Sequence, residues 1–485
     1  MRLLPTPTRY CLPAVGPPGL RARVRTKQIF LRAGLVASLI VGAVTFGFIG
    51  RPALAQEGLF EQDPLTGNWG GERKQLLDEG VQFGASDISE TLSNPVGGIR
   101  QETIYEGLVA ASLDLDLDKL VKWPDAAFHV DGYQISGRGL SENAIGNLLV
   151  VSGIEALAST RLHDLWLQQQ FFDSKVSLRI GQIALDDEFY ISEYSAIFIN
   201  STFGCPDLLS TDLPSGGPCY PFAVPGARLR VAPTDALTFS AAVFNGNPAP
   251  PGPGNPQLRN SSGTNFLIGQ GGTLAVAELA YSFDVKPDLP NPLGDVKLGA
   301  WYNSADFPNL RFDTVGVSLA SPNSNGIPAT YEGEYGLYLI LDKMLWQPPK
   351  ATSQGLGGFL RIGAAPGNQN LIDLEVDAGV TYKGLLPGRQ LDVLGVAVAY
   401  ARIGGAARGL ASDQSMFTGI EQPARDYESV LEVTYQVNIA PWWNLQPDLQ
   451  FLFHPGGNVA APLTLLLARP IPNALVVGLR SAITF

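Results

Sequence analysis

The final twelve residues of the chain, Ala474–Phe485, alternate between two kinds of side chain. Apart from Ser481, the positions of one parity are apolar: Leu475, Val477, Leu479, Ile483 and Phe485. The positions of the other parity are small, polar or charged, apart from Val476. A strand that is apolar on one face and ends on an aromatic ring suits the lipid-facing wall of a closed β-barrel. The pattern therefore predicts a membrane-facing strand at this end of the chain.

Residues 1–55 have the order of features found in an export signal. A basic region between Arg21 and Arg32 precedes the apolar run 33–50, and the motif Ala53-Leu54-Ala55 follows directly. Such a small-residue motif matches the cleavage site of a secretory signal peptide. We therefore expect residues 1–55 to be removed and the mature chain to begin at Gln56. An uncleaved anchor helix is the alternative, because the apolar run is long for a signal peptide.

The charge of the remaining chain excludes one class of partner. Residues 1–55 contain eight Lys or Arg and no Asp or Glu, so the rest has 25 basic and 45 acidic residues and a net charge of −20. An acidic protein of this kind does not attract nucleic acid or anionic substrates through its overall field. With 54 glycines and 45% hydrophobic residues, an exported chain of alternating segments is better explained by a barrel whose outer face meets lipid.

Two cysteines remain after the predicted signal, Cys205 and Cys219, and the segment between them is rich in Pro, Gly and Ser. An even pair of cysteines in an exported protein favours a disulfide, which contributes about 3 kcal/mol in the loop-entropy model. Two free thiols are the alternative. A metal site is disfavoured because no histidine lies near the two thiols in the sequence.

From Val81 to Phe485, strand-like segments alternate with turn signals. In Leu431–Ile439, for example, every odd position is apolar and every even position is polar. We count about sixteen strands, the size class of barrel that encloses an aqueous channel. The predicted fold class is all-β: a transmembrane antiparallel β-barrel formed by residues 81–485 as one domain. Its longer loops are expected at Phe203–Pro225, Asn245–Gly272, Ala320–Thr330 and Gly404–Asp426.

Residues 56–80 form an N-terminal segment ahead of the first strand. Glu72–Glu79 is a short helix candidate, and Gly80 is suited to end it. A helix this short is not stable alone. We therefore expect it to pack against or into the barrel, as a periplasmic or plugging segment.

Four stretches of the chain resemble the carbohydrate-selective porin family of the OprB type. They are Leu65–Gly71 (LTGNWGG), Ile154–Gln169 (IEALASTRLHDLWLQQ), Arg179–Phe189 (RIGQIALDDEF) and a block made of Asn200–Gly204 (NSTFG) and Tyr220–Arg230 (YPFAVPGARLR). The resemblance covers nearly all of the mature chain. It implies a sixteen-stranded barrel in the outer membrane of a Gram-negative bacterium that admits monosaccharides by facilitated diffusion. His163 departs from the pattern, which has a tyrosine there, and this departure leaves the substrate's identity open.

A sugar channel needs aromatic faces for the C–H side of the ring and polar groups of both charge signs for the hydroxyls. If the leucines and the terminal phenylalanine of Asp164–Phe171 face lipid, the opposite face points Asp164, Trp166, Gln168 and Gln170 into the lumen. These side chains form a candidate sugar-binding stripe. The alternative is that Trp166 is an aromatic at the membrane interface and that its polar neighbours are merely solvated.

Three arginines, Arg179, Arg228 and Arg230, alternate with apolar neighbours in the same way. An arginine facing lipid near the midplane would cost about 2–4 kcal/mol, so all three should point inward. They either contact sugar or form an electrostatic ladder with acidic neighbours. Asp187 and Glu188 belong to an acidic cluster that could narrow the pore, bind calcium or lie in a solvated turn.

The predicted pore constriction, or eyelet, consists of Asp164, Trp166, Gln168, Arg179, Asp187, Glu188, Arg228 and Arg230. Other residues of inward parity are expected to belong to the channel wall rather than to the site: Glu278, Trp301, Arg361, Glu375, Asp377, Glu432, Gln436, Asp448 and Gln450.

The three histidines, His129, His163 and His454, have no metal-ligand spacing, and we find no nucleophile motif, Walker loop or dinucleotide fingerprint. We therefore predict a channel for neutral sugars that is not an enzyme and needs no metal or cofactor. The alternatives are a general, non-selective diffusion porin and, less favoured, a structural or adhesin barrel. Expected partners are outer-membrane lipid, the barrel assembly machinery, which would recognise the terminal Phe485, and further copies of the chain in a possible homotrimer.

Overall fold

The computed structural model describes residues 63–485 except 267, 270, 284–292, 350–353 and 463–467. The predicted signal, residues 1–55, lies outside the described residues. Among the helices of the described part, none has both the length and the apolar character required to cross a bilayer.

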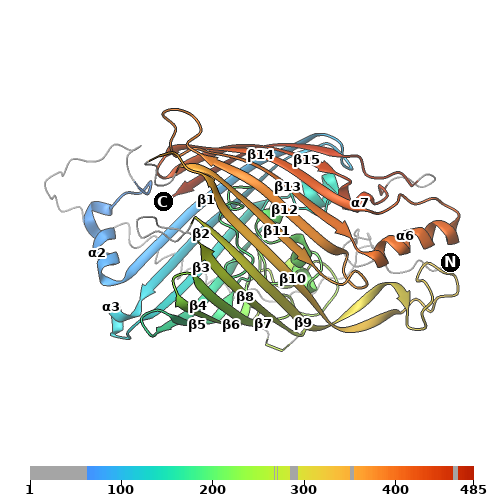
Figure 1. The fold of residues 1–485 in the computed structure, drawn as a ribbon, viewed down its shortest axis with the longest axis horizontal. Coiled ribbons are helices and arrows are strands. Elements are labelled where there is room, and N and C mark those ends of the chain that lie inside the picture. Colours follow the sequence, from blue (N-terminus) through green and yellow to red (C-terminus); the bar gives the residue numbers. More distant parts are fainter. Residues whose placement is uncertain (1–62, 267, 270, 284–292, 350–353, 463–467) are drawn as a thin grey trace, which may run out of the picture. The chain divides into compact units, whose positions relative to one another are not determined.

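The described residues form a closed antiparallel barrel in which each strand pairs with its neighbours in sequence and β16 pairs with β1 (Figure 1). Its strands are β1 Val81–Val96, β2 Thr103–Asp116, β3 Ala126–Gly137, β4 Ser159–Phe171, β5 Val176–Ile183, β6 Val224–Thr234, β7 Leu237–Asn245, β8 Thr273–Phe283, β9 Gly294–Asp313, β10 Pro328–Trp346, β11 Gly355–Ala364, β12 Ile372–Lys383, β13 Val393–Ile403, β14 Tyr427–Ala440, β15 Trp443–Phe453 and β16 Ala474–Thr484. The sixteen strands confirm the predicted fold class.

Helical segments lie before the first strand and between later strands. They are the 3₁₀ turns η1 Trp69–Gly71, η3 Ser201–Phe203 and η4 Pro214–Gly216, the π-helical turn η2 Ser141–Ile145, and the α-helices α2 Glu72–Glu79, α3 Leu117–Val121, α4 Asp207–Ser210, α5 Pro256–Arg259, α6 Gly405–Thr418 and α7 Pro455–Asn458.

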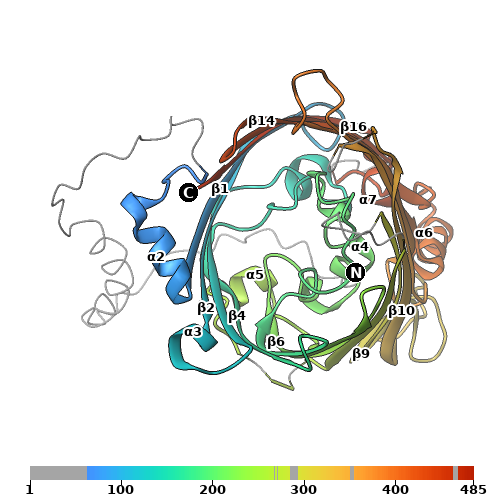
Figure 2. The ribbon, with the colours of Figure 1, turned by 60° about the vertical axis from the view of Figure 1, so that its left-hand side comes forward.

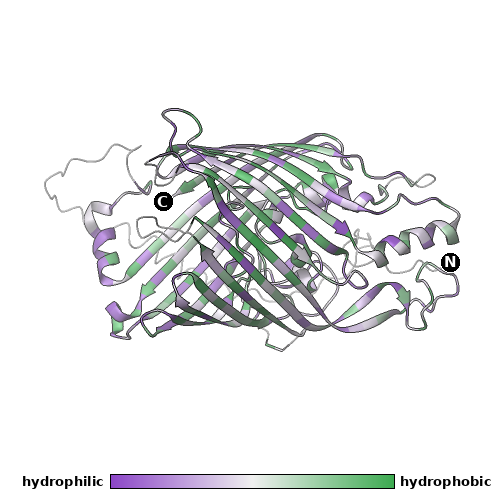
Figure 3. Cartoon of the chain, in the orientation of Figure 1, coloured by the Kyte–Doolittle hydropathy of each residue, from purple (hydrophilic) through white to green (hydrophobic). Residues whose placement is uncertain are grey.

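Alternation along the strands separates the two faces of the wall, as the hydropathy bands of Figure 3 illustrate. In β10, Leu337 and Leu339 are exposed on the outer face, whereas Tyr338 and Ile340 are buried on the inner face. Because successive side chains of a strand point to opposite faces, the same rhythm gives the barrel an apolar outside and a mixed inside.

An ion pair joins the first and last strands on the inner face. Glu90 of β1 lies opposite Arg480 of β16 in the register, and the Glu90 carboxylate accepts from the Arg480 guanidinium at 2.5 Å. Glu90 is buried and Arg480 is half-buried, so the pair is shielded from competing solvent and reinforces the backbone ladder that closes the barrel.

The hydrophobic core lies inside the barrel rather than between layers. Two connections, residues 138–158 between β3 and β4 and residues 184–223 between β5 and β6, fold into the ring of strands (Figure 2). We call them the first and second inner loops. Their buried side chains, including Ile145, Leu149 and Phe203, pack with inward residues of the wall such as Phe359 and Val430. The two inner loops therefore narrow the space enclosed by the strands.

The N-terminal helix α2 lies outside the ring of strands, beside β1 (Figure 2). Gly80 ends it in the left-handed conformation at φ 98°, which glycine adopts without strain. Arg73 of α2 donates to the backbone carbonyl of Phe485 at 3.1 Å, and the N–H of Leu65 donates to the carbonyl of Thr484 at 3.0 Å. The segment is thereby attached to the C-terminal strand.

The connection Gly404–Asp426, expected as a loop, contains the fourteen-residue helix α6. Its glycines and alanines gave little amphipathic pattern to predict a helix from. Asp413 of α6 accepts from Arg311 of β9 through both carboxylate oxygens at 2.8 Å. This two-point hydrogen bond from Arg311 holds the pKa of Asp413 below its usual value.

Candidate functional site

Four neighbouring strands, β3 to β6, carry the polar side chains that face the lumen beside the inner loops. In the register, Gln168 of β4 lies opposite Arg179 of β5, and Arg179 lies opposite Arg228 of β6. Two residues before Gln168 on β4, on the same face, Trp166 lies opposite His129 of β3. Directly opposite residues share a face and contact each other, so the register alone sets these side chains in two adjoining rows.

An aromatic stack covers one side of this wall. The Trp166 ring is stacked on the His129 ring, with centroids 4.9 Å apart and an angle of 17° between the planes. On its other side, the Arg179 guanidinium carbon lies 3.6 Å from the centroid of the Trp166 ring. A guanidinium at this distance makes a cation–π contact, which fixes the orientation of both side chains.

Glu188, from the second inner loop, binds both arginines. Its carboxylate accepts from Arg179 Nη1 at 2.5 Å and from Arg228 Nε at 2.7 Å. The side-chain oxygen of Gln168 accepts from Nη2 of each arginine at 3.0 Å. Gln168, Arg179, Glu188 and Arg228 therefore form one hydrogen-bonded group, which we call the arginine cluster.

The remaining predicted eyelet residues lie outside the arginine cluster. Asp164 is buried, and its carboxylate accepts from the backbone N–H of Ala184 at 3.0 Å, where the second inner loop begins. Asp187 and Arg230 are exposed, and no hydrogen bond or ion pair of the Arg230 side chain is found among the described residues. Trp166 and the arginine cluster thus bring together five of the eight predicted residues.

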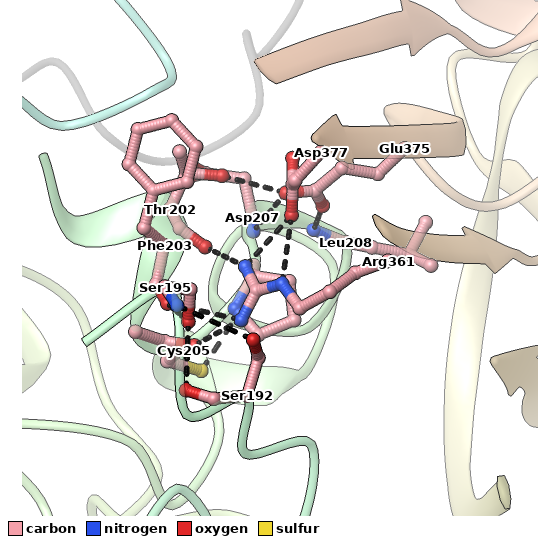
Figure 4. A network of polar contacts seen from close by, with 12 residues as sticks. Ser192, Ser195, Thr202, Phe203, Cys205, Asp207, Leu208, Arg361, Glu375 and Asp377 are labelled. Atoms are coloured by element: carbon pink, nitrogen blue, oxygen red, sulfur yellow. Dashed lines mark hydrogen bonds and ion pairs between the residues drawn. The ribbon is translucent and has the colours of Figure 1, made fainter. Parts of the chain in front are cut away.

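The second inner loop is held from the opposite wall by a buried arginine (Figure 4). Arg361 of β11 is 1% exposed. It donates to the backbone carbonyls of Phe203 and Gly204 at 3.0 Å, to the carbonyl of Thr202, and to the carboxylate of Asp377 at 2.7 Å. One guanidinium therefore caps the turn at η3 and is itself neutralised by a neighbouring strand.

Buried carboxylates of the same wall hold further points of the inner loops. Glu375 accepts from Thr202 Oγ1 at 2.6 Å and from the N–H of Leu208 at 2.6 Å. Glu432 accepts from the N–H of Ile199 at 2.6 Å, and Glu428 accepts from the N–H of Leu149 at 2.7 Å. Hydrogen bonds of backbone N–H groups to a charged carboxylate are stronger than neutral ones, so these residues anchor the loops. Glu375 and Glu432 were predicted as wall residues, and they lie on β12 and β14, whereas sequence reasoning did not assign Glu428.

A disulfide and a buried acid lie within the second inner loop. Cys205 and Cys219 are joined, with their Cα atoms 6.1 Å apart. The N–H of Tyr220 donates to the carboxylate of Asp186 at 3.2 Å. Burial, and then the neighbouring Asp187 carboxylate, raise the pKa of Asp186 to about 7. Cys205, Cys219 and Asp186 lie close enough for a metal site, but the disulfide leaves no thiolate to bind one.

Sequence reasoning did not assign His129 and Ser177 to the site. His129 stacks on Trp166, and Ser177 Oγ accepts from Arg228 Nη1 at 2.6 Å. Both point inward from their strands, β3 and β5, and both lie opposite a predicted site residue in the register: His129 opposite Trp166 and Ser177 opposite Arg230. The signal that could have found them is the position opposite an already chosen residue.

Comparison with known proteins gives a consistent result. The sequence model of the carbohydrate-selective porin, OprB family, matches residues 100–485. Porin B of Pseudomonas aeruginosa is 25% identical over 439 residues, which span 87% of this chain and 91% of that protein. A putative porin, QuiX, of Acinetobacter baylyi is 23% identical and covers 94% of this chain and 99% of its own length.

Solved structures show the same fold. The high-pH structure of OprB from Pseudomonas putida superposes with a TM-score of 0.78 at 23% identity, and the match covers 88% of this chain and 100% of that one. Family and fold together point to a channel rather than an enzyme.

Proposed function

Because this chain belongs to the carbohydrate-selective porin family, OprB, we propose that it is a passive channel for neutral, glucose-like monosaccharides in the outer membrane of a Gram-negative bacterium. The apolar outer face of the barrel supports the location, since such a face suits lipid and not water. Sugar would move down its own gradient through the lumen, without energy coupling.

The observation that carries the proposed selectivity is the contact between Trp166 and the arginine cluster. His129 and Arg179 lie against the two faces of the indole ring, so a pyranose would meet its partly exposed edge, together with the polar groups beside it. Arg179 and Glu188, both partly exposed, lie beside the indole ring and offer donors and an acceptor of opposite charge, and the buried Arg228 holds Glu188 in place. Opposite charges that already neutralise each other suit a solute rich in hydroxyls but without net charge.

Arg230 extends this surface along β6. It is exposed and lies two positions from Arg228 on the same face. A solute leaving the arginine cluster would meet its free donors next. Several weak contacts in series favour entry without trapping the solute.

Planar-bilayer recording with purified protein tests the proposal. Glucose should reduce the ion current of the parent channel, and Trp166→Ala should weaken this block about tenfold, the size expected when a contact of 1–2 kcal/mol is lost. Gln436→Ala is the matched control, because Gln436 is partly exposed on β14, away from the cluster. A parent channel whose current is indifferent to every hexose, pentose and disaccharide would instead be a non-selective diffusion porin.

A further inference from the structure

A second polar group lies next to the arginine cluster, where β4 meets the start of the second inner loop. It consists of His163 and Asp164 of β4, Asp187 of the loop and Asp131 of β3. One ligand atom each of His163, Asp164 and Asp187 lie within 4.8 Å of one another. We call these four residues the histidine–aspartate group.

His163 is the unusual member. It is 3% exposed, and neither of its ring nitrogens makes a hydrogen bond. Nδ1 points into the group, 3.5 Å from Asp131 Oδ1 and 3.9 Å from Asp164 Oδ1. The ring is held by stacking on Tyr133, with centroids 4.4 Å apart. A buried imidazole without a hydrogen bond is costly unless something else binds its nitrogen.

The group also lacks a permanent positive charge. No arginine or lysine of the described residues forms an ion pair with Asp131, Asp164 or Asp187. The nearby Arg179 is bound to Glu188 instead. Buried carboxylates require a counter-charge. Among the described residues, the basic ion-pair partners here are the imidazoles of His163 and, at 4.0 Å from Asp131, His129, while Arg179 acts on Asp187 from beyond ion-pair distance.

We propose that the histidine–aspartate group binds a divalent transition-metal ion such as Zn²⁺. One nitrogen of His163 and one oxygen each of Asp164 and Asp187 are its ligands, Asp131 adds a negative charge beside them, and water completes the shell. Nitrogen together with carboxylate oxygen suits Zn²⁺ and related ions, whereas Ca²⁺ and Mg²⁺ prefer oxygen alone. Ligands of a tetrahedral zinc lie about 3.4 Å apart, so small side-chain rotations close the site.

The position of Asp187 shows how an ion would reach the group and what its binding would affect. Its side chain is exposed, whereas His163 and Asp164 are buried, so an ion reaches the group from the lumen. Asp187 also directly precedes Glu188, whose carboxylate holds Arg179 and Arg228. A bound ion therefore fixes the start of the second inner loop one residue away from the arginine cluster.

Calorimetric titration of the purified, chelator-treated barrel with ZnCl₂ tests this site, and CoCl₂ with visible absorption reports its ligands. The parent protein should bind one equivalent. His163→Tyr, which keeps a ring against Tyr133, and Asp187→Asn should each weaken binding at least tenfold. His454→Ala is the matched control, because His454 lies 3.0 Å from Asp426 in an unrelated histidine–aspartate pair.

Heat-dependent gel mobility verifies that each variant is a folded barrel. Equal zinc affinity in the parent and in folded His163→Tyr would overturn the proposal, and so would a folded parent that shows no saturable binding. Displacement of zinc by equimolar CaCl₂ would overturn the choice of a transition metal. Loss of glucose block without loss of zinc binding concerns the proposed function and leaves this inference standing.

Discussion

The wall formed by β3 to β6 and the wall formed by β11 to β15 carry inward charges in the same alternating pattern, yet these charges meet different surroundings. On β11 to β15, Arg361, Glu375 and Glu432 are buried against backbone groups of the inner loops. On β4 to β6, Arg179 is partly exposed and Arg230 is exposed. Under the proposed function, β11 to β15 position the constriction, and β4 to β6 present it to the solute. Alternation along a strand places a charged side chain in the lumen. Whether that side chain then binds an inner loop or stays accessible depends on how the loops fold.

Replacement of Arg361 should have the largest effect. Arg361→Met leaves Asp377 as a buried charge and three carbonyls without their donor, and removal of one partner of a buried pair costs about 3–5 kcal/mol. We expect a lower unfolding temperature in detergent and a higher, noisier single-channel conductance as the second inner loop loosens. If Arg361→Met had the conductance of the parent protein, Arg361 would not position the second inner loop, and the two walls would not differ in role. Arg230→Met, on the solute-facing wall, is the control.

Removal of the disulfide should have the second largest effect. Cys205→Ser with Cys219→Ser releases a crosslink between positions fourteen apart, which contributes about 3 kcal/mol in the loop-entropy model. The effect should be confined to the second inner loop, because the barrel ladder does not include it. Limited proteolysis should cut the double variant within residues 206–218 while the strands stay protected. Equal cleavage of parent and variant would contradict this local role.

Removing charge from the solute-facing wall should change selectivity more than stability. Glu188→Gln keeps the shape of the side chain but leaves Arg179 and Arg228 without their carboxylate. The reversal potential in a KCl gradient should shift toward anions, and Arg230→Gln should shift it the opposite way. Shifts of the same sign would show that these side chains do not control ion passage.

The smallest effect is expected outside both walls, at the ion pair of Arg311 and Asp413. Because the hydrogen bond from Arg311 lowers the pKa of Asp413 in the folded chain, this stabilisation is complete above its ordinary value of 3.8 and is lost as the pH falls through the lowered pKa. A partly exposed pair contributes below about 1 kcal/mol. Hydrogen exchange of α6, corrected for intrinsic rates, should increase only below pH ~4, and Asp413→Asn should reproduce the increase at neutral pH.

Much of the wall could be predicted from the sequence, because a strand's two faces are a local property. Leu431–Ile439, whose alternation predicts a strand, lies within β14, Tyr427–Ala440. The role of Arg361 was not predictable in the same way, since it binds Phe203, 158 positions away. Its contact depends on how the second inner loop folds, which no local pattern encodes.

In the candidate site, too, the residues on strands could be predicted and the contacts with the loops could not. Trp166, Gln168, Arg179 and Arg228 lie on strands, and the register between those strands explains why they meet. Asp164 has the same inward parity, but the backbone of Ala184 covers it. His163 could not be singled out from spacing, because its neighbours Asp131 and Asp187 come from other parts of the chain. Helix α6 was missed because its alanine- and glycine-rich sequence has little periodicity.

The contact between Glu90 and Arg480 joins partners 390 positions apart. A chain still being delivered to the membrane cannot make it, and until then its leading and trailing edges are both unpaired and open to aggregation. Completion of the cylinder consequently depends on the last segment: a polypeptide cut short before β16 would leave β1 and β15 with unpaired edges.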